Sequence, residues 1–140
     1  MMDLNVSLNT CVSALLYLQQ EVRRAHWNIK GPSFYSLHTL LGDMKGEIED
    51  LHDAIAERIV RLGYVVIGTP IEASIPSSQL NLFPEAQTIS RLLDIYRGTQ
   101  AILKGAVESD SIDYITIDVI TTVANALATH EYKLLGHWIK

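Results

Sequence analysis

Apolar side chains recur at steps of three and four residues along most of this chain, which is the spacing of one face of an α-helix. The first such stretch covers about residues 5–29 and stops at Gly31-Pro32, a pair that ends helices. The second covers about residues 33–62 and stops before Gly63. These stretches predict two long helices, and the short turn between them makes the helices antiparallel neighbours.

Two glycines interrupt the second predicted helix. Gly42 and Gly46 lie in its interior, where each costs up to about 1 kcal/mol relative to alanine. Close packing against a neighbouring helix is the simplest reason for glycine at these positions, and the sequence predicts such packing there.

The second half of the chain carries two further helical stretches. One begins after Pro84 and covers about residues 85–107, and the other covers about residues 111–138. The last stretch begins with β-branched residues, which locally suit a strand. Its length and its apolar repeat decide for a helix. The repeat consists of Ile115, Val119, Val123, Ala126, His130 and Leu134.

A long connection, residues 64–83, joins the second and third predicted helices. A short helical turn at about residues 71–75 is expected within it. An extended segment of about 20 residues spans a helix bundle, so the helices on either side of it can lie parallel. We therefore expect one domain, residues 1–140, with an all-α fold: a four-helix bundle with one long crossover, which is the ferritin-like arrangement.

The composition predicts an oligomer that handles cations. Hydrophobic residues make up 48% of the 140 residues and charged residues 19%. A domain of this size has too little volume to bury that much apolar surface alone, so part of it is expected between subunits. The net charge of -5 argues against a general affinity for phosphate backbones and suits positively charged partners instead.

Cysteine content and the first residues of the chain predict the cellular compartment of the protein. Cys11 is the only cysteine, so an intrachain disulfide is excluded, and its apolar neighbours predict a buried thiol. The first residues lack the basic and apolar segments of a signal peptide. No apolar run approaches the roughly 18 residues of a membrane span. These features predict a cytoplasmic protein without membrane contact.

Four residues are candidate metal ligands. His26 lies near the end of the first predicted helix and His38 in the second turn of the next, so the short turn brings their imidazoles together. Asp53 and Glu57 are four residues apart and share one face of the second helix. Two imidazoles and two carboxylates form a ligand set that suits iron or zinc.

Distance separates the two halves of this ligand set. His38 and Asp53 are 15 residues apart on one predicted helix, which is about 22 Å at a rise of about 1.5 Å per residue. One subunit therefore cannot assemble the four ligands. Two subunits can, if a two-fold axis lays their second helices antiparallel, and that arrangement gives two equivalent sites per dimer.

A di-iron centre inside the bundle is the competing geometry. It needs Glu-x-x-His motifs on two helices and a glutamate on each of the other two. Glu49 and His52 supply one such motif, but the third predicted helix has no histidine and His130 on the fourth is not part of one. The internal centre is short of ligands, so His52 and His130 are interpreted as packing or surface histidines.

The motifs resemble those of the Dps mini-ferritins, the DNA-binding proteins from starved cells. The histidines stand 12 residues apart and Asp53 follows His38 by 15, as in that family. The likeness is carried by His26-Trp27-x-x-x-Gly31-x-x-Phe34-x-x-Leu37-His38, by Asp53-x-x-Ala56-Glu57-Arg58 and by Gly68-Thr69-Pro70.

The resemblance implies a homo-oligomer, a dodecamer with a hollow interior that stores Fe(III) mineral and protects against oxidative stress. It implies that hydrogen peroxide or dioxygen oxidises Fe(II) at ferroxidase sites on two-fold interfaces. The implied ligands and catalytic residues are His26, His38, Asp53 and Glu57. Each interface would hold one iron or a di-iron pair, with zinc as the alternative occupant.

Two departures from the family pattern matter. Many relatives carry an acidic residue four positions after the second histidine, where this chain has Gly42 beside Asp43. The second iron position is therefore expected to be weak or differently ligated. Relatives that bind DNA often use a Lys-rich tail, which is absent from this sequence, and its pI is about 5.4. DNA binding is not expected.

Two further acidic groups have two interpretations each. The first shares one face of the second predicted helix and consists of Asp43, Glu47 and Asp50. It would face the cavity and nucleate mineral, or form an ordinary solvated face. The second gathers around the start of the last helix and consists of Asp110, Asp113 and Asp118. It would line a three-fold pore, as in similar cages, or complement the helix dipole.

Three functions stay open on the sequence alone: an iron-oxidising storage cage, a DNA-compacting protein, and a structural helical oligomer with a zinc-filled site. The acidic charge and the lack of a basic tail disfavour the second. Metal content and the rate of Fe(II) oxidation separate the first from the third.

Overall fold

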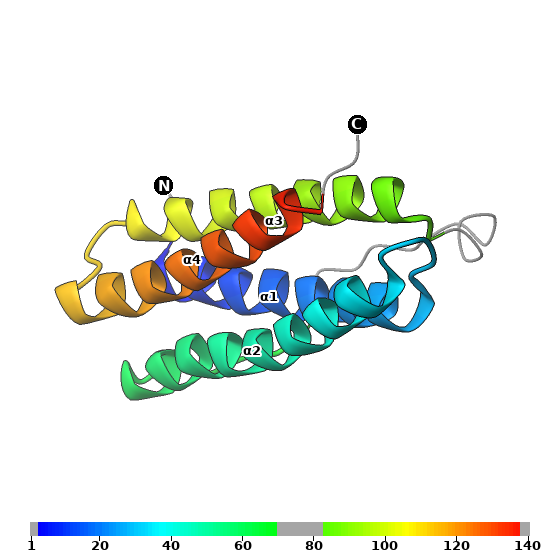
Figure 1. The fold of residues 1–140 in the computed structure, drawn as a ribbon. Coiled ribbons are helices and arrows are strands. Elements are labelled where there is room, and N and C mark those ends of the chain that lie inside the picture. Colours follow the sequence, from blue (N-terminus) through cyan, green and yellow to red (C-terminus); the bar gives the residue numbers. More distant parts are fainter. Residues whose placement is uncertain (1–2, 70–82, 138–140) are drawn as a thin grey trace.

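Four helices form the part of the chain that the computed structural model describes, residues 3–69 and 83–137. They are α1 (Leu4–Asn28), α2 (Phe34–Arg61), α3 (Glu85–Val107) and α4 (Tyr114–Leu135). α1 packs against α2 and α3, and α4 packs against the same two helices from the other side (Figure 1). The predicted all-α four-helix bundle is confirmed.

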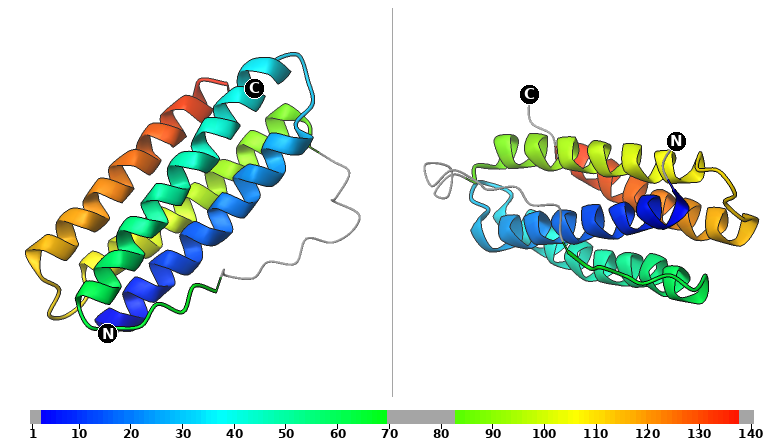
Figure 2. Two further views of the ribbon diagram at one scale, coloured as in Figure 1. Left: turned by 90° about the horizontal axis from the view of Figure 1, so that it is seen from below. Right: turned by 180° about the vertical axis from the view of Figure 1, so that it is seen from behind.

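The long crossover makes α2 and α3 parallel. After α2 the chain turns back along α1, where the Asn9 side chain donates to the carbonyl of Val65 at 3.1 Å and accepts from the amide of Ile67 at 2.9 Å. At the opposite end of the bundle, the amide of Lys30 donates to the carbonyl of Phe83 at 3.1 Å. α2 and α3 therefore both begin at that end, as the left view of Figure 2 shows.

The predicted helical turn at residues 71–75 lies outside the described residues. α4 ends at Leu135 with Gly136 as its C-cap, which is earlier than the predicted end at about residue 138. Within the described residues, no helix is long and apolar enough to cross a membrane.

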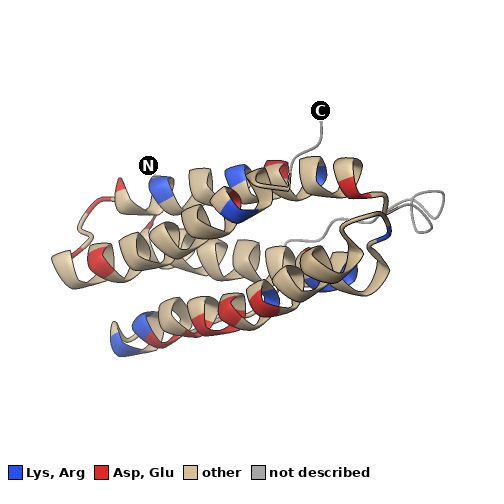
Figure 3. Ribbon diagram, in the orientation of Figure 1, with Lys and Arg blue, Asp and Glu red and all other residues tan. Residues whose placement is uncertain are grey.

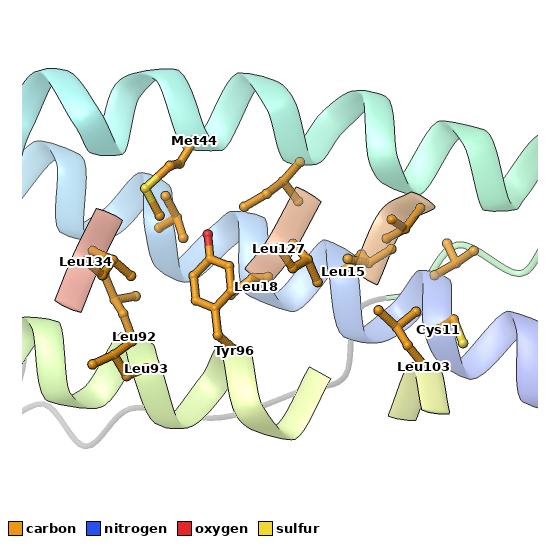
Figure 4. Packing of buried hydrophobic residues seen from close by; sticks show 14 of the residues in the cluster. Cys11, Leu15, Leu18, Met44, Leu92, Leu93, Tyr96, Leu103, Leu127 and Leu134 are labelled. Atoms are coloured by element: carbon orange, nitrogen blue, oxygen red, sulfur yellow. The ribbon is translucent and has the colours of Figure 1, made fainter. Parts of the chain in front are cut away.

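The core is one continuous cluster of aliphatic side chains from all four helices (Figure 4). The apolar stripe predicted for α2 is buried at most of its positions, from Leu37 to Ile59. Cys11 is buried among these side chains, as predicted, and its burial raises the pKa of the thiol to about 12. Tyr96 is an aromatic exception, fully buried, and its hydroxyl points from α3 towards α2 (Figure 4).

The start of α4 differs from the prediction by three residues. Ser111 has a φ of 65°, a left-handed conformation that no helix interior adopts. Asp113 follows in extended conformation as the N-cap, and its carboxylate accepts a hydrogen bond from the amide of Thr116 at 2.8 Å. The helix therefore begins at Tyr114, and Ile112 precedes it.

The buried face of α4 is also shifted by one residue in its first two turns. Ile115 is 45% exposed and Val119 half-buried, whereas Thr116 and Ile120 face the core. Further along, the prediction is confirmed at Val123, His130 and Leu134, but Ala126 is only half-buried and Leu127 takes the core position beside it. The apolar run covers all sides of the helix start, so periodicity alone could not define the buried face there.

Large apolar side chains also remain exposed on this single chain, as an oligomer requires. Three of them surround the turn between α1 and α2: Trp27 is 66%, Phe34 45% and Tyr35 81% exposed. A second group lies at the far end of α2, where Val60 is 60% and Val65 71% exposed. Both ends of α2 thus carry apolar surface that the chain itself does not cover.

Candidate metal centre

His26 and His38 meet where α1 ends and α2 begins. Their rings stack with centroids 4.0 Å apart and planes at 14°. Nδ1 of His26 lies 2.7 Å from the carbonyl oxygen of His38, and Nδ1 of His38 lies 2.7 Å from the carbonyl oxygen of His26. Each imidazole is thus fixed by the backbone of the other residue. The predicted proximity of the two histidines is confirmed.

These hydrogen bonds define which ring nitrogens remain for a ligand. A carbonyl oxygen only accepts, so both Nδ1 atoms carry the hydrogen and donate it. In the neutral rings, Nε2 then keeps its lone pair. Histidine ligands of metals are commonly fixed in this way, with one ring N–H on a backbone carbonyl and the other nitrogen on the metal.

Two neighbours hold the histidine pair from opposite sides. The Phe34 ring stacks on His38 at a centroid distance of 5.0 Å. On the other side, a Cβ at Gly42 would stand 2.9 Å from Cε1 of His26. The close packing predicted for Gly42 is confirmed, and the group packed against it is His26. A Cβ at Gly46 would meet nothing within 4 Å in this chain, so close packing at Gly46 is not found within one subunit.

The turn between the two histidines is clamped to α3. Gly31 has a φ of 145°, and the Glu85 carboxylate occupies the space that a Cβ would need. Oε1 of the same carboxylate accepts a hydrogen bond from the amide of Ser33 at 2.5 Å. Glu85 is buried and stands at the start of α3. Because Gly31 has no side chain, the Glu85 carboxylate can reach the turn, and α3 thereby fixes the angle between α1 and α2.

Asp53 and Glu57 lie towards the opposite end of α2, and both are exposed. The Asp53 side chain is 60% exposed, and its Oδ1 lies 3.4 Å from Nδ1 of His52. Nε2 of His52 in turn lies 3.0 Å from Oε1 of Gln19 on α1. Glu57 borders a shallow, mostly apolar hollow formed with Ala56, Val60 and Val66.

Arg58 anchors this end of α2 to α4. Its Nε donates to Oγ1 of Thr116 at 3.0 Å, and its terminal nitrogen donates to Oδ1 of Asp113 at 3.1 Å. Hydrogen bonds from Thr116, together with the Arg58 charge, hold the pKa of Asp113 below its usual value. Asp113 therefore has a structural partner on each side, while Asp110 and Asp118 are exposed.

The two halves of the predicted ligand set stay apart within one chain. α2 runs unbroken through His38 and Asp53, so the separation of about 22 Å along its axis holds. In residues 3–69 and 83–137, no group of three or more His, Cys, Asp or Glu side chains is placed to hold a metal ion. Any site with all four residues must combine two copies of the chain.

Acidic residues follow much of α2 (Figure 3). Asp43, Glu47 and Asp50 are all exposed, as either of their two interpretations requires. Glu47 also contacts α4, since its Oε2 lies 3.4 Å from Nε2 of the buried His130. Glu21, by contrast, is fully buried on α1 and pairs with Arg91 and Arg24.

Sequence reasoning missed several residues that shape these sites. The stacking of Phe34 on His38 followed from their i, i+4 spacing and could have been found. Gln19 on α1 contacts His52 on α2, and the two residues are 33 positions apart in the sequence. No local sequence pattern predicts a contact of this kind. The contact between Tyr96 and His130, 34 residues apart, is equally invisible to periodicity.

Comparison with known proteins agrees with this architecture. The Ferritin family model, described as a ferritin-like domain, matches residues 6–137. A "DNA protection during starvation protein" of Agrobacterium fabrum is 26% identical over 137 residues, which cover 93% of this chain and 84% of that protein.

Two solved structures share the fold. Dps from Microbacterium arborescens, in a high iron form, superposes with a TM-score of 0.85 at 23% identity and covers 96% of this chain and 91% of its own. A dodecameric thioferritin from Bacteroides fragilis gives a TM-score of 0.80 at 15% identity, with 96% and 83% covered. The chain belongs to the ferritin-like domain family and, within it, to the Dps mini-ferritins.

Proposed function

We propose that this chain is the subunit of a homo-oligomeric cage, a dodecamer, that oxidises Fe(II), stores the Fe(III) product and so protects against oxidative stress. Membership of the ferritin-like family supports iron handling in general. The relatives add specific support, since one is named for protection during starvation, one was solved in a high iron form and one is dodecameric.

The ferroxidase site of this proposal lies between two subunits. His26 and His38 of one copy face Asp53 and Glu57 of a second copy across a two-fold axis, and the reverse pairing forms a second site. The observation that carries the proposal is the histidine pair, because mutual Nδ1–H bonds to backbone carbonyls leave two Nε2 atoms for a ligand. Exposed apolar surface at both ends of α2 supports the pairing.

The chemistry follows from the ligand types. Carboxylates and imidazoles bind Fe(II), and the negative charge of Asp53 and Glu57 favours the more highly charged Fe(III) product. Two ferrous ions supply the two electrons that reduce one hydrogen peroxide to two waters, and dioxygen is the alternative acceptor. Because Gly42 contributes no ligand, one iron position per site has fewer protein donors than in relatives with an acid there.

The other acidic groups take supporting roles in the proposal. Asp43, Glu47 and Asp50 present exposed carboxylates along α2 and would nucleate mineral. Asp110 and Asp118 are exposed near the start of α4 and would attract Fe(II) to a pore. Asp113 is the weakest candidate of that group for attracting Fe(II), because its carboxylate already accepts hydrogen bonds from the Thr116 amide and from Arg58.

Fe(II) oxidation by the purified oligomer tests the function. Wild type is expected to oxidise Fe(II) with peroxide well above the rate of the His26→Ala/Asp53→Ala double variant. The matched control is Asp94→Ala, which removes another exposed acid, on α3, and should oxidise iron like wild type. Equal rates in wild type and the double variant would overturn the proposal. Light scattering is expected to give about 190 kDa, from twelve copies of a 15.6 kDa chain.

Two further measurements separate the rival functions. Purified protein loaded with zinc that never exchanges for Fe(II) would favour a structural oligomer. Retardation of plasmid DNA at physiological salt would favour a DNA-compacting protein, against the expectation from the net charge of -5.

A further inference from the structure

A tyrosine and a histidine form a polar pair inside the apolar core. Tyr96 on α3 is fully buried, and His130 on α4 is 1% exposed. The Tyr96 hydroxyl lies 2.8 Å from Nδ1 of His130, and the two rings meet edge to face with centroids 5.7 Å apart. The core cluster around this pair is aliphatic, and Figure 4 shows Tyr96 among leucines and Met44.

The contacts of His130 define the direction of the hydrogen bonds. Nε2 of His130 lies 3.4 Å from Oε2 of Glu47, and an ionised carboxylate only accepts. Nε2 therefore carries the ring hydrogen, and Nδ1 has a lone pair that accepts from the Tyr96 hydroxyl. Burial lowers the pKa of His130, so the ring is neutral at neutral pH and Nδ1 keeps its lone pair.

The same chain of contacts leads from the core to the surface. Glu47 is about half exposed, at 52%, and belongs to the acidic face of α2. Phenol, imidazole and carboxylate thus form a continuous path from Tyr96 to solvent. Burial also raises the pKa of Tyr96 well above its usual value, with the charges of Glu131 and Glu47 adding to the effect. The phenol is held in its protonated form and has one base in contact with it.

We propose that Tyr96 and His130 form a redox site in which Tyr96 gives up one electron to a strong oxidant while its hydroxyl proton passes to Nδ1 of His130. The product is a neutral tyrosyl radical hydrogen-bonded to an imidazolium. A phenol cannot readily lose an electron in an apolar core while keeping its proton, because a buried cation without compensation is costly. A base already in hydrogen-bond contact removes that obstacle.

The oxidant in this step is the hydroxyl radical that Fe(II) generates from hydrogen peroxide by one-electron transfer. It takes the electron of Tyr96 and one proton from solvent and becomes water. The O–H bond of Tyr96 breaks, its proton stays on Nδ1 of His130, and the Glu47 carboxylate on Nε2 balances the charge of the imidazolium. A further Fe(II) returns the electron to the tyrosyl radical and becomes Fe(III), and the Nδ1 proton moves back to the phenol oxygen.

The physiological role rests on the proposed function, since iron and peroxide supply the oxidant there. Fe(II) on the acidic face of α2 would stand beside Glu47, and the path from that carboxylate to the phenol consists of two contacts of 3.4 and 2.8 Å. Tyr96 and His130 would therefore consume hydroxyl radicals that form when peroxide is reduced by one Fe(II) instead of two.

A first experiment tests the redox pair without iron. The iron-free oligomer is oxidised by photogenerated tris(bipyridine)ruthenium(III), freeze-quenched at increasing delays and examined by electron paramagnetic resonance. A long-lived tyrosyl signal is expected in wild type and is expected to vanish in Tyr96→Phe. Tyr132→Phe is the matched control, because it removes a 77% exposed tyrosine from α4 close to His130 and should keep the signal.

The histidine is tested in the same samples. In wild type, the high-field g-values should show a radical hydrogen-bonded to a proton donor, and His130→Leu, which has no donor, should lose this shift and shorten the radical lifetime severalfold. A persistent radical of unchanged yield in Tyr96→Phe would overturn the proposal, and so would unchanged g-values in His130→Leu. The second criterion holds even if the phenylalanine variant fails to fold.

A second experiment adds Fe(II) and hydrogen peroxide and measures hydroxyl radical by spin trapping. Tyr96→Phe is expected to release severalfold more spin adduct than wild type while it oxidises Fe(II) at the same rate. Equal adduct yields would overturn the protective role. A wild type that forms the radical photochemically but oxidises no iron would instead overturn the proposed ferroxidase function and leave the redox pair standing.

Discussion

The two ends of α2 hold their candidate ligands in opposite ways. At the start of the helix, His26 and His38 are fixed by stacking, by two backbone carbonyls and by the contact with Gly42. Towards its other end, Asp53 and Glu57 project into solvent, and Asp53 has one long contact to His52.

This difference indicates where precision is built into the site. The imidazoles are preorganised within one subunit, so in the proposed site little ordering would remain when a metal binds. In that proposal the carboxylates would gain a defined position only when another subunit covers them. One end of α2 would supply ligand geometry, and the other would supply negative charge that assembly positions.

Removing the preorganised end should have the largest effect. His38→Ala deletes one ligand and also the carbonyl-bound ring that stacks on His26. The rate of Fe(II) oxidation should fall by more than the roughly 10–100-fold that loss of an outer-shell partner costs at metal sites. Stopped-flow absorbance of the Fe(III) product measures this rate. A rate within a factor of three of wild type would show that the histidine end is not the site.

Gly42→Ala should have the next largest effect, because its Cβ would stand 2.9 Å from Cε1 of His26. Displacing the ring should weaken the hydrogen bond to His38 and cost about 1–3 kcal/mol, as overpacking does. Urea unfolding at fixed subunit concentration measures the loss, and Fe(II) oxidation should slow in the same variant.

Gly98→Ala is the matched control for that substitution. The chemical change is the same and the position is again a helix interior, on α3, but a Cβ at Gly98 meets nothing within 4 Å in the subunit. Alanine there should stabilise the helix by up to about 1 kcal/mol. Equal losses at both positions would contradict the claim that Gly42 serves the histidine pair.

Asp113→Ala should have a moderate effect at the carboxylate end. It removes the N-cap of α4 and the partner of Arg58, at a cost of about 0.5–2 kcal/mol. Asp110→Ala, from the same group of acids, should stay within about 0.5 kcal/mol of wild type. Thermal unfolding distinguishes the two. A loss of iron uptake in Asp113→Ala at unchanged stability would instead favour a pore role.

The Asp113 effect should depend on pH in one direction. Its folded-state pKa lies below the usual value, so its stabilisation is fully present above the unfolded pKa of about 3.9. That contribution is lost as the pH falls through the lower folded pKa. The difference in unfolding free energy between wild type and Asp113→Ala should therefore shrink in acid. Growth of the difference below pH 4 would contradict this assignment.

His52→Gln should have the smallest effect. Its contact with the exposed Asp53 carboxylate is 3.4 Å long, and exposed pairs of this kind contribute about 0.2–1 kcal/mol. The rate of Fe(II) oxidation should change by at most about fivefold. A loss as large as that of His38→Ala would show that the carboxylate end is preorganised too, and the contrast between the two ends would fail.

Much of this architecture follows from the sequence, for reasons visible in particular residues. Periodicity and the pair Gly31-Pro32 suffice for two antiparallel helices and hence for the meeting of His26 and His38. The rise per residue of an α-helix is enough to show that His38 and Asp53 are about 22 Å apart. These conclusions depend only on local geometry, which a sequence encodes directly.

Other features depend on packing between distant segments, and these escaped prediction. Gly42 and Gly46 look alike in sequence, yet within the subunit only a Cβ at Gly42 would meet a neighbouring side chain. The apolar start of α4 leaves its buried side undefined, so Ile115 was assigned to the core although it is 45% exposed. The pairing of Tyr96 with His130 joins two helices through their three-dimensional arrangement alone.

The central claim, that the metal site is shared between subunits, is tested most directly by mixed oligomers. One variant lacks the imidazoles (His26→Ala/His38→Ala) and the other lacks the carboxylates (Asp53→Ala/Glu57→Ala), and each alone should be inactive. Co-assembled in equal amounts, half of the two-fold pairs combine the two variants, and each such pair has one intact site. The account predicts recovery of about a quarter of the wild-type rate of Fe(II) oxidation per subunit. No recovery in a properly assembled mixture would contradict it.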